Sequence, residues 1–566
     1  MKFIATYNQL YLKGICCLIL YTTILNTTEC HAQNNICFKV NMKKTIECGL
    51  FLPTENDSVI IRGSFNGWKG NDFILEDVDN DDIYEQTFTI DSDSGITHEF
   101  KYLIVKSNGQ VLWEKYPNKD NKPNGNRLTN STQNKIDEFD FDKYYLGVVG
   151  IDVIFSVEDI KNDFIEFKNT LEEQHCCLYE YTSNQEIDHL FDSQYQKLTK
   201  PMSPSEFFKI LTPITAKIGC GHTAVWMPGG FWDMGKDHLF PLKIHLIEDY
   251  VVVEGSYDGS SIIKKGSVLK EINGVPISDI INEMQVNYSA DAMNIHFINS
   301  QIERRFPLIY ARRFGFKDKF QIKYTHPNKK VSEIKELLPT SISSVRSIVF
   351  SNFNHPPLQM EIVDESTAVI KIPTFSYYDR VPYFTNFIDS CFAVINNKGV
   401  NNLILDLRGN DGGDPFCAAP LFSYLQKKPE PYFSEPYGKY SELAKPISLP
   451  ENHFTGNLYT IIDGRCFSTN GHFCSLLKYH NIGKFIGTES GATYKCNAGK
   501  NTVIHLCNTK IMLYFGRSTF AAAVKGMDKT KPIMPDYPVR ETYQDFLDNK
   551  DLFMEKAMEQ IALDSL

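Results

Sequence analysis

The chain has 566 residues, which is too long for one hydrophobic core, so two to four domains are expected. A hydrophobic share of 42% with 22% charged residues is typical of a globular protein and excludes a disordered one. The net charge of -11, without a long basic run, argues against a nucleic-acid partner, because phosphate binding requires clustered lysine and arginine.

Residues 1–33 have the pattern of a secretory signal peptide. Lys2 and Lys13 supply positive charge, the short apolar run GICCLILYTTIL follows, and Ala32 suits the last residue before cleavage. We therefore expect an exported protein, periplasmic or extracellular, with attachment to the cell surface left open. No later segment is long and apolar enough to span a bilayer, so no integral membrane span is expected after signal removal. An uncleaved membrane anchor is the alternative interpretation.

The cysteines suggest disulfides rather than a metal site. The chain has 14 of them, and the signal peptide contains three, so an odd number remains and at least one thiol stays unpaired. Cys37 with Cys48, and Cys496 with Cys507, are candidate disulfides in an exported protein, although spacing alone decides neither pair. No cysteine or histidine spacing predicts a metal site, and we expect no cofactor.

Residues 34–145 carry the pattern of short β-strands. SVIIRGSFNGW, DIYEQTFTI and HEFKYLIV alternate or run apolar between Asn, Asp and Gly turns, which predicts a β-sandwich. The turn GSFNGW, the strand FKYLIV and the segment LWEKYPN resemble the "GxxxxW", "EYKF" and "WExxPN" motifs of starch-binding modules of carbohydrate-binding family 20.

This resemblance implies a sugar site. Trp68 and Trp113 would stack on a sugar ring, and Lys101 and Asn118 would hydrogen-bond its hydroxyl groups, so a glycan such as an α-glucan becomes a candidate partner. The alternative is that both tryptophans fill the core of a module that serves as a spacer.

Residues 150–237 are predicted to be helical. The last helix begins at SPSE, with a capping serine and an early carboxylate, and ends at Gly219-Cys220-Gly221, so His222 stands in a turn that can present it to a cleft. Residues 238–300 resemble a PDZ domain through IIKKGSVLKEINGVPISDIINEM, a unit that binds an extended peptide at a sheet edge. Residues 301–365 are predicted to be connecting strands.

Residues 366–566 alternate strands and helices, which predicts an α/β domain. Ser468 follows the strand LYTIID and precedes a helix, where free N–H groups can stabilise an oxyanion. The alternative role of Ser468 is an ordinary helix N-cap.

Several ordered segments resemble the C-terminal-processing and tricorn-type serine peptidases. LILDLRGNDGG is similar to their "DLRGNGGG" motif, YTIIDGRCFSTNGHF and FIGTESG are similar to the nucleophile segment and the "GxxTxG" strand after it, and PIMPDYPVR is similar to the closing "PD" strand. The resemblance covers about residues 150 to 566 and implies a crotonase-like core that cleaves polypeptides.

The resemblance also implies roles for single residues. Ser468 would be the nucleophile, and the N–H groups of Thr469 and of Gly412 or Gly413 would form the oxyanion hole. The family's activating lysine is missing at Gly491-Ala492, with Lys495 out of register.

The family's second way of activating its serine uses a histidine before the PDZ-like unit. His222 matches that position and would be the general base. The group that orients it is unclear from the sequence, since Met534 stands where an acid would be expected and Glu489 is the substitute. His472 is a competing base, ranked lower because a side chain one turn along the helix tends to point away from Ser468.

The predicted function is therefore an exported serine endopeptidase that acts through an acyl-enzyme on Ser468. The alternative is a catalytically inactive relative that binds peptide or glycan. An enzyme of polysaccharide use is disfavoured, because the C-terminal half has no convincing carboxylate pair for glycoside hydrolysis.

Overall fold

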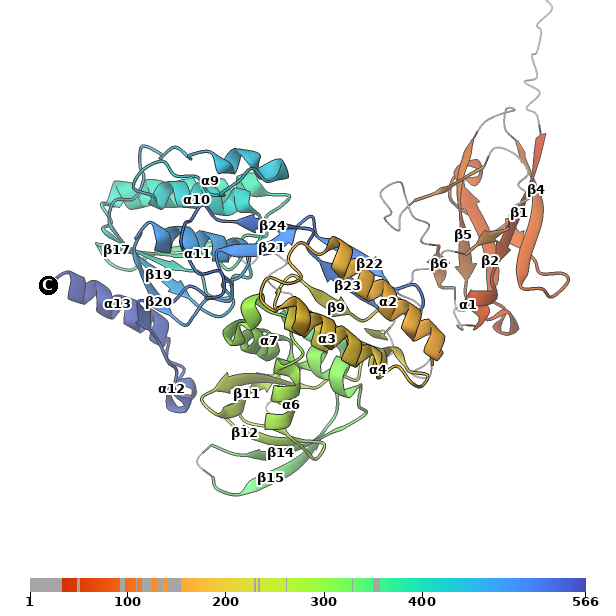
Figure 1. The fold of residues 1–566 in the computed structure, drawn as a ribbon, viewed down its shortest axis with the longest axis horizontal. Helices are drawn as coiled ribbons and strands as arrows, with labels where there is room; N and C mark the ends of the chain where they lie inside the picture. The colour runs from red at the N-terminus through yellow and green to blue at the C-terminus, as the bar shows by residue number, and fades with distance from the viewer. Residues whose placement is uncertain are drawn as a thin grey trace, which may run out of the picture. The chain divides into compact units, whose positions relative to one another are not determined.

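The structure is a computed structural model. It describes residues 33–47, 51–91, 97–107, 109–114, 125–129, 136–139, 154–228, 231–232, 235–260, 262–327, 329–349 and 357–566. The predicted signal peptide, Cys48 and Asn118 therefore lie outside the described residues. The chain divides into two compact units, one formed mainly of residues up to Phe141 and the other mainly of Asp142–Leu566 (Figure 1).

The first unit contains two sheets. One has the order β3 (Ile74–Leu75), β2 (Ser58–Gly63), β5 (His98–Val105) and β6 (Val111–Trp113), with β7 (Arg127–Thr129) also paired to β5. The other has the order β4 (Ile83–Asp91), β1 (Gln33–Asn41) and β8 (Asp137–Glu138), and the short helix α1 (Lys43–Glu47) follows β1. The strands predicted in SVIIRG, DIYEQTFTI and HEFKYLIV are confirmed as β2, β4 and β5.

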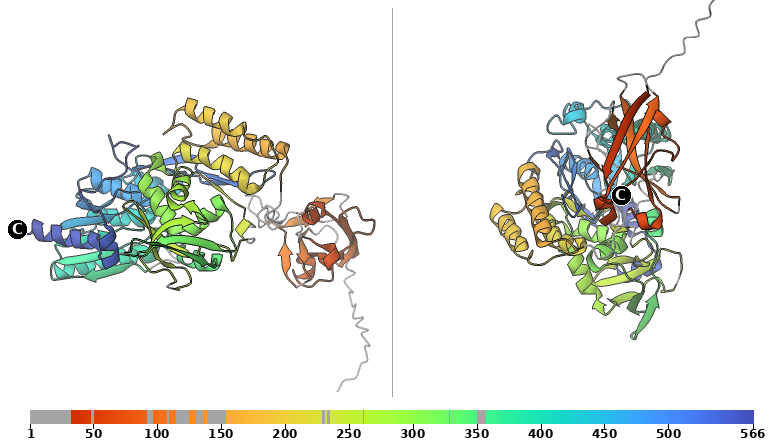
Figure 2. Two further views of the ribbon diagram at one scale, coloured as in Figure 1. Left: turned by 90° about the horizontal axis from the view of Figure 1, so that it is seen from below. Right: turned by 90° about the vertical axis from the view of Figure 1, so that its right-hand side faces the viewer.

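The second unit begins with three helices. They are α2 (Val157–Gln174), α3 (Asn184–Tyr195) and α4 (Pro204–Ile218), which lie together in Figure 2. Each starts after a serine whose hydroxyl accepts the backbone N–H of the third helical residue, as the capping pattern of the sequence indicates. Gly219, at φ 73°, ends α4 in the left-handed conformation that glycine tolerates best.

A six-stranded antiparallel sheet occupies the middle of this unit. Its order is β10 (Leu242–Ile247), β11 (Tyr250–Ser256), β12 (Val268–Ile272), β14 (Phe320–Thr325) and β15 (Ser332–Leu337), with β13 (Val275–Pro276) beside β12. Helices α6 (Ile277–Gln285), α7 (Ile295–Phe314) and α8 (Ile342–Val349) accompany it. The segment expected to hold only connecting strands differs: residues 301–314 are helical, and β14 and β15 extend this sheet because β14 pairs with β12.

The C-terminal α/β domain is built on a second six-stranded sheet. Its order is β16 (Gln359–Ile362), β17 (Thr367–Lys371), β18 (Asn402–Asp406), β19 (Asn457–Ile462), β20 (Lys484–Gly487) and β25 (Tyr537–Pro538), all parallel except β16. Leu403 and Leu405 pack toward α9 (Val381–Lys398), α10 (Pro415–Leu425) and α11 (Thr469–Tyr479), whereas Ile404 packs toward α13 (Leu552–Asp564), which follows the short α12 (Tyr543–Asp548). Alternate strand residues thus fill two hydrophobic layers, as expected for a parallel sheet.

Two small sheets complete the unit. In one, β21 (Lys495–Gly499) pairs with β24 (Ser518–Ala521). In the other, β22 (Thr502–His505) and β23 (Met512–Phe515) are joined by β9 (Ala224–Trp226), the strand directly after His222. This pairing ties the end of the helical region to the chain that follows Ser468.

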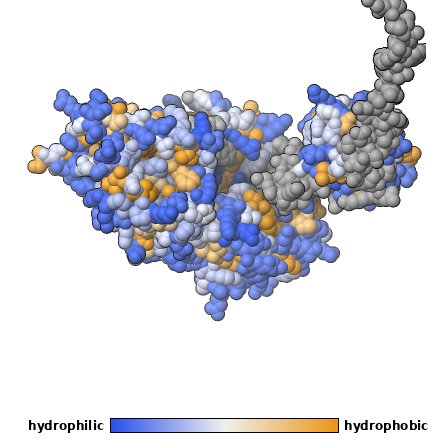
Figure 3. Space-filling view, turned by 90° about the horizontal axis from the view of Figure 1, so that it is seen from above, coloured by the Kyte–Doolittle hydropathy of each residue, from blue (hydrophilic) through white to orange (hydrophobic). Residues whose placement is uncertain are grey.

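No helix in the described parts of the chain is long and apolar enough to cross a membrane. On the face shown in Figure 3, hydrophobic residues are scattered among hydrophilic ones.

Candidate active site

Ser468 occupies a sharp turn between β19 and α11. Its backbone lies at φ 56° and ψ -125°, a conformation that non-glycine residues rarely adopt. Its side chain makes no capping hydrogen bond to α11, so the N-cap role considered from the sequence does not describe it. A strained turn between a strand and a helix is the way in which many hydrolases expose a nucleophile.

The glycine loop after β18 packs directly against this turn. A Cβ on Gly412 would lie 2.7 Å from the Phe467 carbonyl oxygen and 2.9 Å from the Thr469 nitrogen, so only glycine fits there. The Gly412 N–H, however, donates to Asn410 Oδ1 at 2.9 Å. In the described part of the chain the N–H groups of Gly413 and Thr469 have no such acceptor, and they are the pair left to bind an oxyanion.

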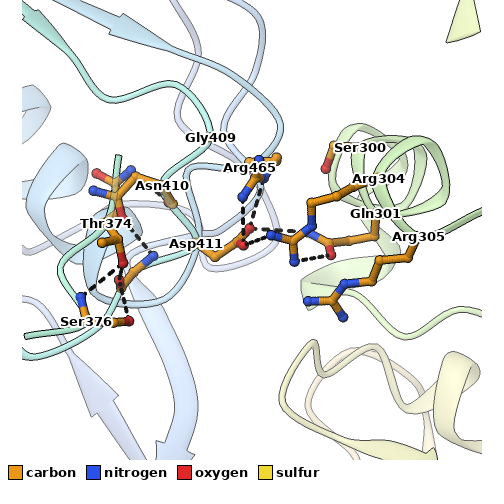
Figure 4. A network of polar contacts seen from close by, with 12 residues as sticks. Ser300, Gln301, Arg304, Arg305, Thr374, Ser376, Gly409, Asn410, Asp411 and Arg465 are labelled. Carbon is orange, nitrogen blue, oxygen red and sulfur yellow. Dashed lines mark hydrogen bonds and ion pairs between the residues drawn. The ribbon is translucent and has the colours of Figure 1, made fainter. Parts of the chain in front are cut away.

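A partly buried ion network, in which the Asp411 side chain is 31% exposed, fixes this loop (Figure 4). Asp411 accepts hydrogen bonds from Arg304 at 2.7 Å and from Arg465 at 2.9 Å, which joins the loop to α7 and to the turn before Ser468. Burial opposes ionisation of the Asp411 carboxyl, but the two guanidinium groups outweigh it and lower its pKa to about 2. The loop is therefore held by a carboxylate that stays charged at neutral pH.

His222 lies beside the serine turn, although 246 positions separate it from Ser468 in the sequence. Its ring stacks on Phe467, with centroids 4.6 Å apart and an interplanar angle of 17°. Gly221 makes this approach possible, because a Cβ there would lie 2.6 Å from the Phe467 ring. Burial, with a smaller contribution from His472, lowers the pKa of His222 to about 3, so its imidazole is neutral and can accept a proton.

Cys496 contacts both of the predicted catalytic residues. Its Sγ is 3.7 Å from Ser468 Oγ and 3.5 Å from His222 Nδ1. The predicted Cys496–Cys507 disulfide is wrong, because both thiols are free: Cys496 is buried on β21 and Cys507 is exposed after β22. The sequence offered no signal for this contact, since it depends on the β9–β23 pairing.

The acid suggested as the partner of His222 is placed elsewhere. Glu489 Oε2 lies 3.0 Å from His296 Nε2, at the start of α7, so this carboxylate belongs to a different histidine. Lys495 likewise forms an ion pair with Glu180 at 2.5 Å. Both side chains are thus engaged away from Ser468.

Asp291 is a residue near the site that sequence reasoning missed. Its Oδ1 accepts the backbone N–H of Gly221 at 2.8 Å, next to His222. Its Oδ2 is buried without a hydrogen-bond partner in the described chain, and burial raises the pKa of the carboxyl to about 7. A buried aspartate of this kind marks functional sites often enough to be tested.

His472, the competing base considered from the sequence, lines the same cavity as Ser468. Its Nε2 donates to the Phe520 carbonyl at 3.2 Å, which leaves Nδ1 as the acceptor nitrogen. Burial lowers the pKa of His472 to about 4, so it too is neutral. It remains a second candidate base.

A cavity of about 960 Å³ unites these groups. The residues that line it include His222, Gly412, Gly413, Ser468, Thr469 and Cys496, together with Trp226, Trp232 and Tyr514. An apolar cavity with a few polar groups at one place is the usual form of a binding site.

Residues 366–539 match the model of the family described as Peptidase family S41. The match, together with the fold, indicates a serine-type peptidase. No curated protein matches the chain. Among solved structures, mature CPAF complexed with lactacystin is similar at 14% identity and a TM-score of 0.53, over 72% of this chain and 98% of that one. Mature CPAF alone is similar at 13% identity and a TM-score of 0.50, over 69% and 94%. At these identities the likeness to CPAF shows the fold alone.

The four residues predicted to bind sugar lie in the first unit, and three of them are described. The rings of Trp68 and Trp113 lie 6.3 Å apart at 33°, and Trp113 is 37% exposed. Lys101 pairs across the sheet with Arg62, whose guanidinium lies 5.3 Å from the Trp113 ring centre. Asn118 lies outside the described residues.

Proposed function

We propose that this protein is an exported serine endopeptidase in which Ser468 attacks the peptide bond and His222 acts as the general base. The S41 match supports a serine-type peptidase with polypeptide substrates. The catalytic roles of Ser468 and His222 and the export of the chain belong to the proposal.

One observation carries the assignment of the nucleophile. Ser468 adopts a strained backbone conformation beside two donor-ready N–H groups, those of Gly413 and Thr469, in a cavity that also contains a neutral histidine. Strain of this kind persists only where the surrounding structure enforces it, and it clusters at active sites.

The reaction would run in two halves. His222 takes the Ser468 proton as Oγ attacks the carbonyl carbon, and the N–H groups of Gly413 and Thr469 stabilise the oxyanion. His222 then gives the proton to the leaving amine, and water hydrolyses the ester. In the described chain Ser468 Oγ and the His222 imidazole both contact the Cys496 sulfur and form no hydrogen bond to each other, so direct proton transfer requires Oγ and the imidazole to come closer.

Labelling with a fluorophosphonate serine probe tests this proposal. We expect the parent to label, and Ser468→Ala and His222→Ala to lose labelling by about 10⁴-fold or more, because the members of such a dyad act as a unit. Ser390→Ala and His189→Ala, which change exposed residues on α9 and α3, are the matched controls. Lactacystin, the ligand in one CPAF structure, serves as a second probe that should compete with labelling.

A folded parent that does not label would refute the peptidase mechanism. It would favour the alternative, an inactive relative that binds peptide in the same cavity. The contact of Cys496 with both catalytic candidates, which form no hydrogen bond to each other in the described chain, is the observation that favours this alternative.

We also propose that the first unit binds a glycan such as an α-glucan through Trp68 and Trp113. The proximity of the two rings and the exposure of Trp113 support this proposal, because sugar rings stack on aromatic faces. Retention of the protein on immobilised amylose is the test. Trp68→Ala and Trp113→Ala should each weaken retention, whereas Val78→Ala, a change of an exposed apolar residue in the same unit, should not. Equal retention of all four proteins, or none by the parent, would exclude the glycan role.

A further inference from the structure

The cavity that contains Ser468 carries a surplus of positive charge, although the chain as a whole has a net charge of -11. Asp411 is the one carboxylate among its described lining residues, and it is already paired with Arg304 and Arg465. The cationic lining residues are Arg305, Arg312, Arg313, Arg346 and Lys500. Such a wall suits a ligand that carries negative charge.

Arg312, in the last turn of α7, has a charge that the described residues do not neutralise. Its guanidinium lies over the ring of Trp232, 5.1 Å from the ring centre, and its Nε is buried without a hydrogen-bond partner in the described chain. Burial lowers the pKa of Arg312 to about 10, so the side chain still carries its charge at neutral pH. A buried charge without a counterion is costly, and a bound carboxylate would remove that cost.

The neighbouring Arg313 shows the ordinary role of an arginine at this place. Cations in the last turn of a helix complement the helix dipole. Arg313 is also paired with Glu283 and donates a hydrogen bond to Thr212 Oγ1 at 2.8 Å. Arg312 lines the same cavity, but none of the ion pairs among the described residues includes it. Helix stability therefore accounts for Arg313 and leaves Arg312 available to a ligand.

Arg346 reaches the same wall from α8. The residues directly before the two arginines, Ala311 and Val345, are buried in one hydrophobic cluster, because α7 and α8 pack against each other. Arg346 is exposed and takes part in no ion pair in the described part of the chain. Beyond the effect of burial, its charge and that of Arg305 lower the pKa of Arg312 further, since like charges repel. An anion bound beside them would relieve this repulsion.

Helix α7 sets the distance between these arginines and the bond to be cut. Gln301 lies at the near end of its lining face, because its Nε2 donates to Asp411 Oδ1 in the glycine loop at 3.3 Å (Figure 4). Arg305 and Arg312 follow four and eleven residues later, which is about 6 and about 16 Å along a helix. An extended substrate advances about 3.3 Å per residue, so this wall lies about two to five residues from the scissile bond.

We propose that Arg312 and Arg346 form a subsite for an acidic side chain of the substrate, a few residues from the bond that is cut. This inference rests on the proposed function. Since an endopeptidase cuts within a chain, the anion expected at this distance is an aspartate or glutamate side chain rather than a chain end. A guanidinium stacked on an indole ring still offers the N–H groups at its edge, which bind a carboxylate through two hydrogen bonds.

Cleavage of a synthetic peptide library of randomised sequence, read by mass spectrometry, tests the subsite. We expect glutamate or aspartate to be enriched at a position about two to five residues from the cut. The best acidic peptide should be cleaved with a kcat/KM at least about tenfold above that of the same peptide with glutamine in that position, because hydrogen bonds between charged groups contribute that much.

The preference for the acidic peptide over the glutamine peptide should fall at least about threefold in Arg312→Gln and in Arg346→Gln. Arg540→Gln, which changes an exposed arginine that does not line the cavity, is the matched control and should keep the preference. Because Arg346 is exposed, Arg346→Gln should fold even if Arg312→Gln does not. An unchanged preference in Arg346→Gln and in a folded Arg312→Gln would overturn the proposal.

Amidation of the peptide C-terminus distinguishes a side chain from a chain end. The acidic peptide should be cleaved within about threefold of its original rate after amidation, since its terminal charge is distant and screened. A preference that disappears on amidation would overturn the subsite. So would the lack of any acidic preference in a parent that labels with fluorophosphonate and cleaves peptides, and that outcome would retain the peptidase.

Peptide binding decides the subsite if the parent neither labels nor cleaves. The probes are a fluorescent peptide of alanine and glutamate and its counterpart of alanine and glutamine, and the readout is fluorescence anisotropy with the full chain. Tighter binding of the glutamate peptide that is weakened in Arg346→Glu would retain the subsite while the peptidase assignment fails. Equal binding of the two peptides, or equal binding by the parent and Arg346→Glu, would overturn the subsite as well.

Discussion

Replacing Gly412 with alanine should disable the oxyanion hole while leaving the domain folded. Gly412 has φ 99°, and a Cβ there would lie 2.8 Å from Ser468 Cβ and 2.9 Å from the Thr469 nitrogen. These are atoms of the serine turn itself, so the turn must move by several tenths of an ångström to admit the methyl group. The Thr469 N–H would then be misplaced, and losing one oxyanion donor typically costs about 10²–10³ in rate.

Gly409→Ala is the matched control, because the two glycines share the loop and a positive φ. Gly409 lies at φ 75°, and its Cβ would meet only the tip of the Arg465 side chain, at 3.2 Å. Alanine at such a φ costs roughly 1–2 kcal/mol in either position. Gly412→Ala adds a clash with the serine turn to this strain, so it should lose more thermal stability than Gly409→Ala and, unlike Gly409→Ala, most of its fluorophosphonate labelling rate.

The assay is the initial labelling rate of purified full-length protein, with the melting temperature measured on the same samples. If Gly412→Ala labels within about threefold of Gly409→Ala at a temperature where both proteins are folded, the assignment of the oxyanion hole to this turn is incorrect.

Three more outcomes follow from the site. Because His222 has a pKa of about 3, the labelling rate of Asp291→Asn, which lacks the nearby carboxyl with a pKa of about 7, should show no inflection between pH 4 and pH 8, and an inflection near 6.5 would show a solvated base instead. Because the pKa of Asp291 is raised in the folded state, its contribution to stability is greatest below its unfolded pKa of 3.8 and is lost as the pH rises toward about 7. Asn does not titrate, so Asp291→Asn should gain stability relative to the parent as the pH rises through that window. Denaturant unfolding at several pH values measures the difference. A constant difference across the window would contradict a buried, titrating Asp291. Lys495→Ala should keep labelling within about threefold, since Lys495 pairs with Glu180, and loss as complete as in Ser468→Ala would restore lysine as the base.

The sequence located the parts of the site that are encoded by local pattern. Ser468 follows a strand and precedes a helix, and the glycines of RGNDGG require a loop, so their positions could be predicted from neighbouring residues. His222 could be singled out only by its position before the PDZ-like segment. Its closeness to Ser468 depends on stacking with Phe467, which no local pattern encodes.

The remaining parts of the site depend on contacts between distant segments. Gly413 rather than Gly412 is the proposed oxyanion donor because the Gly412 N–H donates a hydrogen bond to Asn410. Glu489 was misassigned because His296, which competes for it, is far away in the chain. Cys496 and Asp291 were missed because each gains its significance from tertiary packing beside His222.

The small sheet of β9, β22 and β23 joins the two chain segments that contain the proposed catalytic residues. Residues 366–566 contain Ser468, its turn and both proposed oxyanion donors. His222, by contrast, belongs to the segment that follows the last helix of the helical region. Undocking that segment would separate acid–base chemistry from the nucleophile while the parallel sheet stayed intact. Undocking would therefore inactivate the proposed centre, and redocking would restore it, at a lower free-energy cost than unfolding the whole domain.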